Sequence, residues 1–294
     1  MKVATQLSVL DHDDQLGTMP KSGKRSRKQK KMNEKEIQYF FDDDDTLKSS
    51  PLKLYQNMSY LSNKEKQNFE QQFHQPKNKS QELYIHLLQD KNKKIVVSNG
   101  PAGTGKTLFA TECGIKFLLT GVYDKLIFTR PSVSVDEDLG YLPGSLEEKM
   151  APWVRPIYDI LYRFLSPREV SQMIEDKVIE ISPLGFMRGR TFVNAWIVAD
   201  EMQNSTVAQM KMLLTRLGEN SRLIITGDLE QYDHNFEKNG LDDFLQRFKG
   251  KRSSSISSFE FERNDVQREE VVKEILDIYS GEVLPDYSSE ENSV

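Results

Sequence analysis

A glycine-rich stretch in the first half of the chain has the residue types and the spacing of a phosphate-binding loop. Residues 100–107 read GPAGTGKT and match the pattern G-x-x-x-x-G-K-[ST]. Glycines at this spacing let successive backbone N–H groups turn toward an anion, and the following helix begins with the positive end of its dipole at the same point. The residues expected to hold the phosphates are Gly100, Pro101, Ala102, Gly103, Thr104, Gly105, Lys106 and Thr107.

The last two residues of this loop have the side chains that triphosphate chemistry needs. Lys106 is expected to reach the β- and γ-phosphates, and the Thr107 hydroxyl to ligate Mg²⁺. Asp200 and Glu201 follow the apolar run WIVA (196–199), so both carboxylates leave a strand at its end. There Asp200 would hold the Mg²⁺ together with Thr107, and Glu201 would orient or deprotonate a water. The alternative for such an acidic pair is a solvated turn.

A second apolar run that ends in polar residues, RLIITGDLEQYD (222–233), repeats this arrangement. Asp228 and Gln231 are candidates for contact with the γ-phosphate or its water, and so for sensing hydrolysis. Gln203 could act similarly. The alternative is a polar turn.

The elements that position these residues alternate between short β-rich runs and helical stretches. Residues 81–89 and the segment from the loop to Leu119 have helical patterns, as do 146–165 and 205–217. Strand-like runs lie at 95–97, 125–129, 177–183, 196–200 and 222–228. This alternation predicts a doubly wound α/β core with a mainly parallel sheet, whose ligands gather at the carboxyl ends of the strands.

Composition limits the class of protein. The 294 residues are 37% hydrophobic and contain one cysteine, which excludes an internal disulfide and a cysteine zinc site. Cys113 falls in the helix after the loop and is expected to be buried. No run approaches 18 apolar residues, and the first residues are too polar for a secretory signal. We therefore expect a cytoplasmic protein with no membrane partner.

Charge divides the chain into segments. The net charge of −5 argues against a uniformly basic nucleic-acid binder, but the cluster 21–31 is strongly basic. That cluster is either a nucleic-acid arm or a solvated, disordered segment. We expect a polar, largely disordered segment over 1–76, a single core domain over 77–280 and an acidic disordered tail over 281–294.

Several longer stretches resemble, in order, the PhoH family of ATPases, which is similar to the nucleotide-binding core of superfamily 1 helicases. They are GPAGTGKT (100–107), TRPSV (129–133), LGYLPGSLEEKMAPWVRPIYD (139–159), PLGFMRGRT (183–191), DEMQN (200–204), QMKMLLTRLG (209–218), TGDLEQYD (226–233) and NGL (239–241). The resemblance covers about residues 77–280 and implies a P-loop NTPase with a RecA-like sheet. It also implies ATP hydrolysis with Mg²⁺, RNA or single-stranded nucleic acid as a partner, and ring-like oligomers.

The resemblance assigns further roles to single residues. Gln81 corresponds to a glutamine that reads adenine in related helicases, and Tyr84 would lie against the base. Arg268 in FERNDVQREEVV resembles the family's late arginine, a candidate finger for the γ-phosphate. The chain departs from the family at Met202, where alanine is usual, and at SVDED (134–138), which leaves no assigned role for Glu137.

The resemblance also implies how Arg268 is supplied. Related helicases place ATP between two core domains, and the residues after 248 are too few for a second one. We therefore expect a head-to-tail ring, a hexamer by resemblance, in which Arg268 faces the phosphate on a neighbouring copy.

Three functions fit these residues: an ATPase coupled to nucleic acid, a nucleotide-dependent switch or assembly module with protein partners, and a small-molecule or nucleotide kinase. A GTPase is disfavoured because no N-K-x-D motif follows the loop. Arg188 and Arg190 are candidates either for phosphodiester contact or for bridging subunits. Phe186, Phe192 and Tyr141 are candidates either for base stacking or for the core.

Overall fold

The structure of this chain is a computed structural model, and it describes residues 62–131, 146–232, 238–272, 275 and 278. These residues belong to one of the two compact units into which the chain divides, Leu47–Val294. The basic cluster 21–31, the SVDED stretch, Tyr141 and the tail 281–294 lie outside the described residues.

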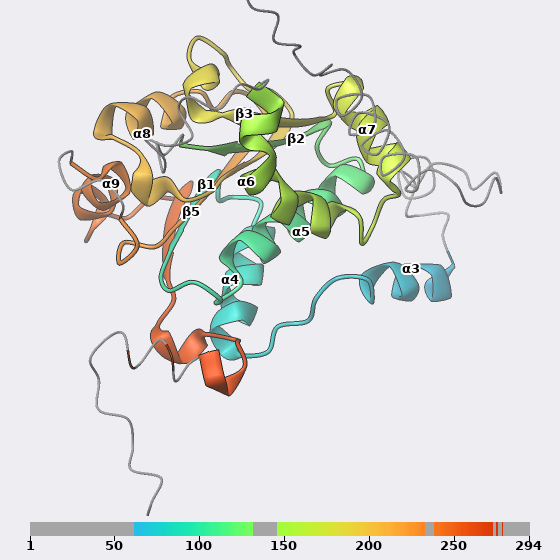
Figure 1. Cartoon of the computed structure of the whole chain (residues 1–294), viewed down its shortest axis with the longest axis horizontal. Coiled ribbons are helices and arrows are strands. Elements are labelled where there is room, and N and C mark those ends of the chain that lie inside the picture. The colour runs from blue at the N-terminus through green and yellow to red at the C-terminus, as the bar shows by residue number, and fades with distance from the viewer. Residues whose placement is uncertain (1–61, 132–145, 233–237, 273–274, 276–277, 279–294) are drawn as a thin grey trace, which may run out of the picture. The chain divides into compact units, whose positions relative to one another are not determined.

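The described part of the chain is built on a six-stranded sheet with the order β3-β2-β4-β5-β1-β6, in which every pair of neighbours is parallel (Figure 1). The strands are β1 (Ile95–Asn99), β2 (Lys125–Arg130), β3 (Ile179–Pro183), β4 (Ala195–Ala199), β5 (Arg222–Gly227) and β6 (Ile256–Glu260). Because all strands run the same way, their carboxyl ends meet at one edge of the sheet.

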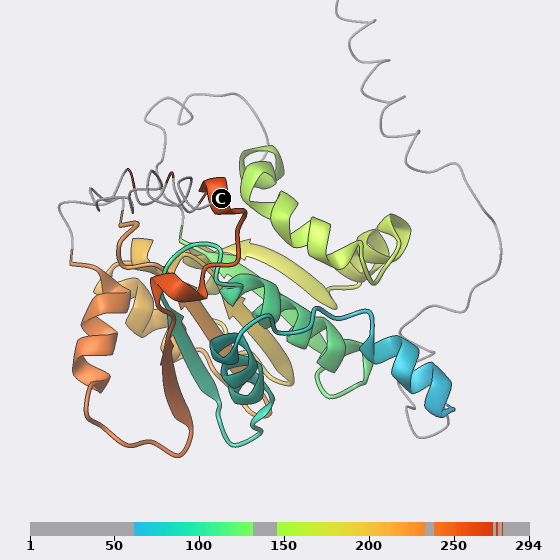
Figure 2. The same ribbon diagram turned by 90° about the horizontal axis from the view of Figure 1, so that it is seen from below.

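Helices cover both faces of this sheet, as Figures 1 and 2 show. One face carries α4 (Lys79–Gln89), α5 (Lys106–Leu119), α6 (Leu146–Leu161) and α7 (Pro167–Glu175), and the other carries α8 (Val207–Leu214) and α9 (Gly240–Phe248). The helix α3 (Asn63–Glu70) lies beyond the sheet and adds Phe69 to the apolar cluster on the first face. Three short 3₁₀ turns complete the described elements: η2 (Leu184–Met187), η3 (Met202–Asn204) and η4 (Arg263–Asp265). The α/β architecture predicted from the sequence is therefore confirmed.

Successive residues of each central strand enter opposite halves of the core. Val96 packs with the α3–α7 side and Val97 with the α8–α9 side, and both side chains are fully buried. Strands covered on both faces are apolar at consecutive positions, which explains runs such as WIVA. Trp196 on β4 also donates its indole N–H to the carbonyl of Ala110 at 3.0 Å, which fixes α5 against the sheet.

The folded unit begins before residue 77, where the sequence predicted its boundary. Ser62 caps α3 through a capping box with Glu65, and Phe69 at the end of that helix is fully buried. Phe73 stacks on Phe164 with ring centroids 4.7 Å apart. Burying a phenylalanine contributes roughly 1.5–3 kcal/mol, so these residues are part of the core.

The segment between α3 and α4 is also held by polar contacts. The His74 ring nitrogen Nδ1 lies 2.6 Å from Glu112 Oε1, and the backbone N–H of His74 donates to the same carboxylate at 2.9 Å. Arg163 Nη1 donates to Glu112 Oε1 at 3.0 Å. Because the Glu112 side chain is almost fully buried, these partners compensate its loss of solvent.

The strand β6 was not predicted, although it extends the sheet beyond β1. Its sequence ISSFE is short and partly polar, and its residues are half-buried or exposed, as is usual at a sheet edge. None of the described helices is long and apolar enough to cross a membrane.

Candidate nucleotide site

The order of the strands places the predicted loop and both polar strand ends in one cleft. Residues 100–105 connect β1 to α5, and β5 lies between β1 and β4. The carboxyl ends of β4 and β5 therefore lie next to the loop. The cleft is lined by Ala102, Gly103, Gly105, Lys106, Thr107, Leu108, Asp200, Glu201, Gly227, Asp228 and Gln231.

Lys106 begins α5, and its side chain folds over the loop. Its ammonium donates hydrogen bonds to the carbonyl oxygens of Gly100 at 2.5 Å and Pro101 at 2.8 Å. Burial lowers the pKa of this ammonium, while the carboxylates of Asp228, Glu201 and Asp200 act in the opposite direction. A lysine in this environment can exchange its carbonyl partners for phosphate oxygens.

Thr107 and Asp200 meet across the cleft although 93 positions separate them in the chain. The Thr107 hydroxyl donates to Asp200 Oδ1 at 2.8 Å, and the hydroxyl of Thr226 on β5 donates to the same oxygen. Hydroxyl and carboxylate oxygens are the hard donors that Mg²⁺ prefers, and the ion usually keeps water and phosphate oxygens as its other ligands. Thr107 and Asp200 therefore fit as a Mg²⁺ pair.

Glu201 lines this cleft and has an unusual backbone conformation. Its φ is 53° and its ψ is 39°, the left-handed region that a residue with a side chain rarely adopts. Such a conformation persists only where neighbouring contacts hold it, and it is common at functional sites. Glu201 Oε2 accepts a hydrogen bond of 2.5 Å from Gln203 Nε2.

The end of β5 supplies the remaining predicted residues. Asp228 is buried, and its desolvation raises the pKa of its carboxyl, while the nearby Lys106 lowers it. Gln231 is exposed and lines the cleft. The structure thus brings Lys106, Thr107 and Asp200 together with Glu201, Asp228 and Gln231.

The two residues expected at the base are buried beneath the loop. Gln81 donates from Nε2 to the carbonyl of Thr104 at 3.1 Å and accepts from the backbone N–H of Lys77 at 2.8 Å. In this structure its amide therefore supports the loop. Tyr84 is fully buried and packs on Phe259 and Phe261, so the expectation that it lies against a base is wrong.

Arg268 lies against the phosphate-binding loop of its own chain. A Cβ atom on Gly103 would come within 2.6 Å of Arg268 Nε, so the arginine side chain passes directly over this glycine, whose φ of 87° also disfavours other residues. The backbone N–H of Gln267 donates to the carbonyl of Gly103 at 3.0 Å and fixes the segment there. The sequence instead predicted that this arginine would face the loop of a neighbouring copy.

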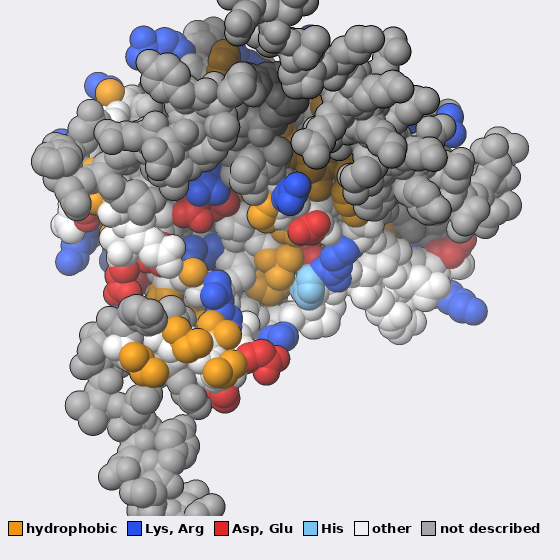
Figure 3. Space-filling model, viewed as in Figure 1, with side chains coloured by type: hydrophobic (Ala, Val, Ile, Leu, Met, Phe, Trp, Pro, Cys, Tyr) orange, Lys and Arg blue, Asp and Glu red, His pale blue; other side chains and the backbone are white. Residues whose placement is uncertain are grey.

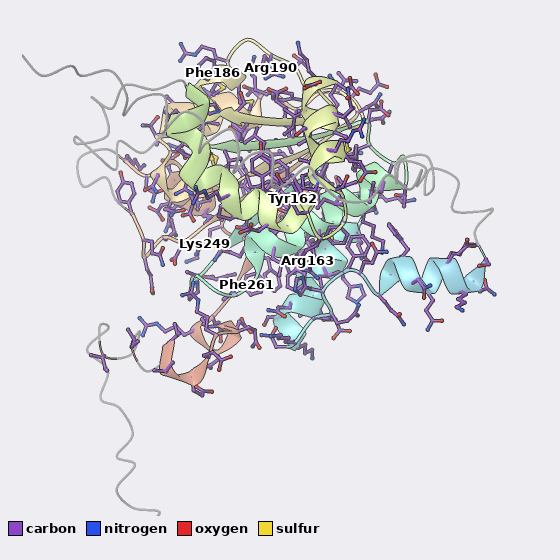
Figure 4. All side chains as sticks on the ribbon, turned by 45° about the vertical axis from the view of Figure 1, so that its right-hand side comes forward. Tyr162, Arg163, Phe186, Arg190, Lys249 and Phe261 are labelled. Atoms are coloured by element: carbon purple, nitrogen blue, oxygen red, sulfur yellow. The ribbon has the colours of Figure 1, made fainter. Side chains whose placement is uncertain are left out.

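The basic stretch after β3 contains two arginines in different environments. Arg190 forms a two-pronged ion pair with Glu180, one arm at 2.7 Å, and its guanidinium lies 4.8 Å from the Phe192 ring. Its donors are therefore engaged within the chain, whereas Arg188 is exposed. Phe192 is buried in the core and Phe186 is exposed, in the segment that Figure 4 labels together with Arg190.

Two polar residues of the site were missed by the sequence reasoning. Thr226 binds Asp200 as described above, and Asn99 Oδ1 at the end of β1 accepts from the backbone N–H of Leu229 at 3.2 Å. Both are polar residues near the carboxyl end of an apolar strand, which was the available signal. Met202, the departure from the family pattern, is fully buried in the apolar cluster on the α8–α9 side.

Residues 74–280 match the family model described as PhoH-like protein. The chain is 42% identical over 200 residues to a PhoH-like protein of Synechocystis, covering 68% of this chain and 60% of that protein. It is 44% identical over 190 residues to a PhoH-like protein of Bacillus subtilis, covering 64% and 59%. It is 39% identical over 207 residues to Protein PhoH of Escherichia coli K12, covering 69% and 57%. This chain therefore matches somewhat less than two thirds of the length of these relatives.

Among solved structures, a Pif1 helicase from Candida albicans aligns with a TM-score of 0.35 and 13% identity, covering 71% of this chain and 45% of that one. The Hef helicase domain of Pyrococcus furiosus aligns with a TM-score of 0.36 and 13% identity, covering 60% and 37%.

Proposed function

Because this chain belongs to the PhoH family and carries a nucleotide-binding P-loop domain, we propose that it binds ATP with Mg²⁺ and hydrolyses the γ-phosphate. We further propose that it couples hydrolysis to the binding or remodelling of RNA or single-stranded nucleic acid. One observation carries the hydrolytic part: the Thr107 hydroxyl and the Asp200 carboxylate meet at 2.8 Å beside Lys106 and Glu201.

In this proposal the residues of the cleft and Arg268, which lies against the loop, have separate tasks. Lys106 and the N–H groups of the loop neutralise the phosphate oxygens, and Thr107 and Asp200 hold Mg²⁺, which would offset charge on the β- and γ-phosphates. Glu201 accepts a proton from the attacking water, and Gln231 contacts the γ-phosphate or that water. Arg268 supplies positive charge at the transferring phosphoryl group.

The assignment of ATP rests on the family and on the lack of a guanine-reading motif. Gln81 is proposed as the reader of adenine from the family resemblance alone, since in this structure its amide is buried and bonded to the backbone of Lys77 and Thr104. Asp228 completes the polar lining opposite the loop.

Nucleic-acid binding is proposed from the exposed residues after β3. Arg188 offers a guanidinium to a phosphodiester, and Phe186, whose side chain is 59% exposed, offers a ring on which a base can stack. The basic cluster 21–31 would add salt-sensitive affinity.

A second candidate function, a nucleotide-dependent switch or assembly module with protein partners, is favoured by a different surface. Val271, Ile275 and Ile278 recur at helical spacing and are 47–59% exposed. Figure 3 shows apolar side chains gathered where Figure 1 draws the end of the described chain. Exposed apolar groups of this kind often mark protein contacts. A head-to-tail ring, a hexamer by resemblance, would be one such assembly, and sedimentation of the purified chain would test it.

The test of the proposed function is phosphate release by the purified chain with Mg²⁺-ATP, with and without RNA, single-stranded DNA and duplexes. Lys106→Ala should abolish release and weaken ATP binding. Glu201→Gln should retain ATP and Mg²⁺ but hydrolyse at least about 10²-fold more slowly, because the amide cannot take a proton. Turnover that no nucleic acid stimulates would favour the switch, and near-normal turnover by Lys106→Ala would remove the assignment of the loop.

A further inference from the structure

We propose that Gln203 is a positioning residue that holds Glu201 for activation of the attacking water and ties it to the end of β5. This inference rests on the proposed hydrolysis of ATP. Gln203 lies in η3, two residues after Glu201, and its side chain is 1% exposed. A buried amide is retained at low cost only where its hydrogen bonds are made.

All polar atoms of the Gln203 side chain have partners at the site. Nε2 donates to Glu201 Oε2 at 2.5 Å and to the backbone carbonyl of Gln231 at 3.3 Å. Oε1 accepts from the backbone N–H of Asp228 at 3.1 Å. One amide thus connects the expected base to both ends of the segment 228–231, which lines the cleft.

The backbone of Glu201 needs such support. Its left-handed conformation is unfavourable for a residue with a side chain, by an amount on the order of 1 kcal/mol. A partly exposed glutamate that lines a cleft also has several rotamers open to it. The hydrogen bond from Gln203 selects the one in which the carboxylate stays beside the loop.

Gly227, the last residue of β5, makes room for this arrangement. A Cβ at this position would lie 2.9 Å from Gln203 Oε1 and 2.4 Å from Leu241 Cδ2. The close approach therefore depends on a residue from each element, Gln203 in η3 and the glycine at the end of β5. It gives a physical reason for the glycine in the TGD sequence that does not involve a ligand.

This geometry couples two parts of the site. The segment 228–231 contains Asp228 and Gln231, whose backbone groups bind Gln203. A change at the γ-phosphate that displaces this segment therefore also displaces the partners of Gln203. The same amide would transmit that displacement to Glu201. Loss of Gln203 should therefore reduce the chemical step and leave nucleotide binding intact.

Two variants separate the two halves of the amide. Gln203→Met keeps the length of the side chain and removes every hydrogen bond, and Gln203→Glu keeps an acceptor for Asp228 but places a carboxylate oxygen against Glu201. Both should bind nucleotide within about twofold of the wild type, and kcat should fall about 10²-fold with KM nearly unchanged. Amide exchange at Asp228 should accelerate in Gln203→Met and stay slow in Gln203→Glu, whatever the turnover.

A double-mutant cycle with Glu201→Gln distinguishes positioning from simple structural damage. If Gln203 acts through Glu201, Gln203→Met should lower kcat by less than about threefold in the Glu201→Gln background. As a control, Ser221→Ala removes two buried hydrogen bonds, to Phe192 O at 2.8 Å and from Ala195 N at 3.0 Å, away from the site. It should lower the melting temperature and leave kcat unchanged.

The outcomes separate this inference from the proposed function. A wild-type chain that releases no phosphate contradicts the proposed function. The exchange measurement at Asp228 then still tests whether Gln203 holds the backbone N–H of Asp228 at the end of β5. If the wild type turns over and a folded Gln203→Met variant keeps its kcat, Gln203 does not position Glu201. Equal losses in the wild-type and Glu201→Gln backgrounds would also overturn the inference, because the effect would then be independent of Glu201.

Discussion

At the scale of single residues, burial governs the charges that face each other at the site. It lowers the pKa of Lys106 and raises the pKa of Asp228, while the attraction between the two groups opposes both shifts. In the folded chain the buried ammonium and carboxylate are thus poorly solvated. Such groups gain most from a ligand that brings opposite charge, and phosphate and Mg²⁺ are such ligands.

The raised pKa of Asp228 predicts a pH-dependent contribution to stability. The folded chain binds a proton at Asp228 at a pH where the unfolded chain has lost it, so this carboxyl favours folding most at acid pH. That contribution is lost as the pH rises through the folded-state pKa. Asp228→Asn should therefore raise the free energy of unfolding at pH 7, because asparagine has no charge to desolvate. The gain over wild type should shrink toward zero as the pH falls below 4.

Denaturant unfolding at a series of pH values would measure this difference. Asparagine keeps the side-chain oxygen that accepts from the backbone N–H of Glu230 at 3.0 Å, so the loop geometry should survive. Glu175→Gln, which removes a carboxyl at an exposed position on α7, is a matched control. A variant less stable than wild type at every pH would mean that the Asp228 carboxylate stabilises the fold.

At the scale of elements, the segment that leaves β3 shows how packing separates two similar side chains. Arg190, which lies after η2, forms an ion pair with Glu180 on β3, and this pairing lowers the pKa of the Glu180 carboxyl. Arg188 follows η2 and is exposed. Of these two arginines, Arg188 is therefore the one whose guanidinium a nucleic-acid phosphate could bind without breaking an ion pair.

Exchanging each arginine for alanine should give two distinct results. Arg188→Ala should weaken binding of single-stranded nucleic acid and reduce the slope of log K against log salt by about 1, as for one lost phosphate contact. Arg190→Ala should leave that slope unchanged and lower the melting temperature, since half-buried Glu180 loses its partner. Binding titrations at several salt concentrations would measure both. The reverse assignment of the two effects would place the nucleic acid on Arg190.

At the scale of the whole molecule, a segment from the far end of the described chain lies against the phosphate-binding loop. Arg268 packs on Gly103 of the same chain, so we expect it to act on the nucleotide bound by its own loop. Arg268→Ala should bind ATP and lose about 10³-fold in kcat, the lower range for arginines that stabilise a transferring phosphoryl group. Mixing Arg268→Ala with Lys106→Ala protein should then restore no activity.

A sizing measurement must accompany this mixing assay. If the chain forms rings and the mixture regains activity, the arginine acts on a neighbouring copy after all. If Arg268→Ala turns over like wild type, Arg268 has no role in the chemical step.

The start of the folded unit gives a second prediction at this scale. A chain that begins at residue 62 keeps α3 and should retain ATP turnover, while it loses any salt-sensitive affinity that the cluster 21–31 provides. A chain that begins at residue 77 loses the buried Phe69 and the stacked Phe73. It should be less stable by at least about 3 kcal/mol, the usual effect of emptying one buried phenylalanine site. Thermal unfolding of the two truncations would distinguish them, and equal melting temperatures would restore the boundary at 77.

The sequence by itself determined the phosphate-binding loop, the α/β class and the polar residues at the ends of β4 and β5. These features depend on local requirements: glycines where the backbone must turn, apolar runs where a strand is buried on both faces, and polar residues where such a strand ends. Each of these local requirements can therefore be identified from residue types and their spacing in the sequence. The edge strand β6 was not predicted, because its partly exposed residues form no such apolar run.

Only the tertiary structure decided which of these residues meet. The sequence does not state that β5 lies between β1 and β4, and that order is what brings Thr107 within 2.8 Å of Asp200. It also does not state that Gln81 and Tyr84 are buried, or that Arg268 folds back on its own loop. These contacts join residues far apart in the chain. They therefore follow from strand order and side-chain packing, which no local pattern records.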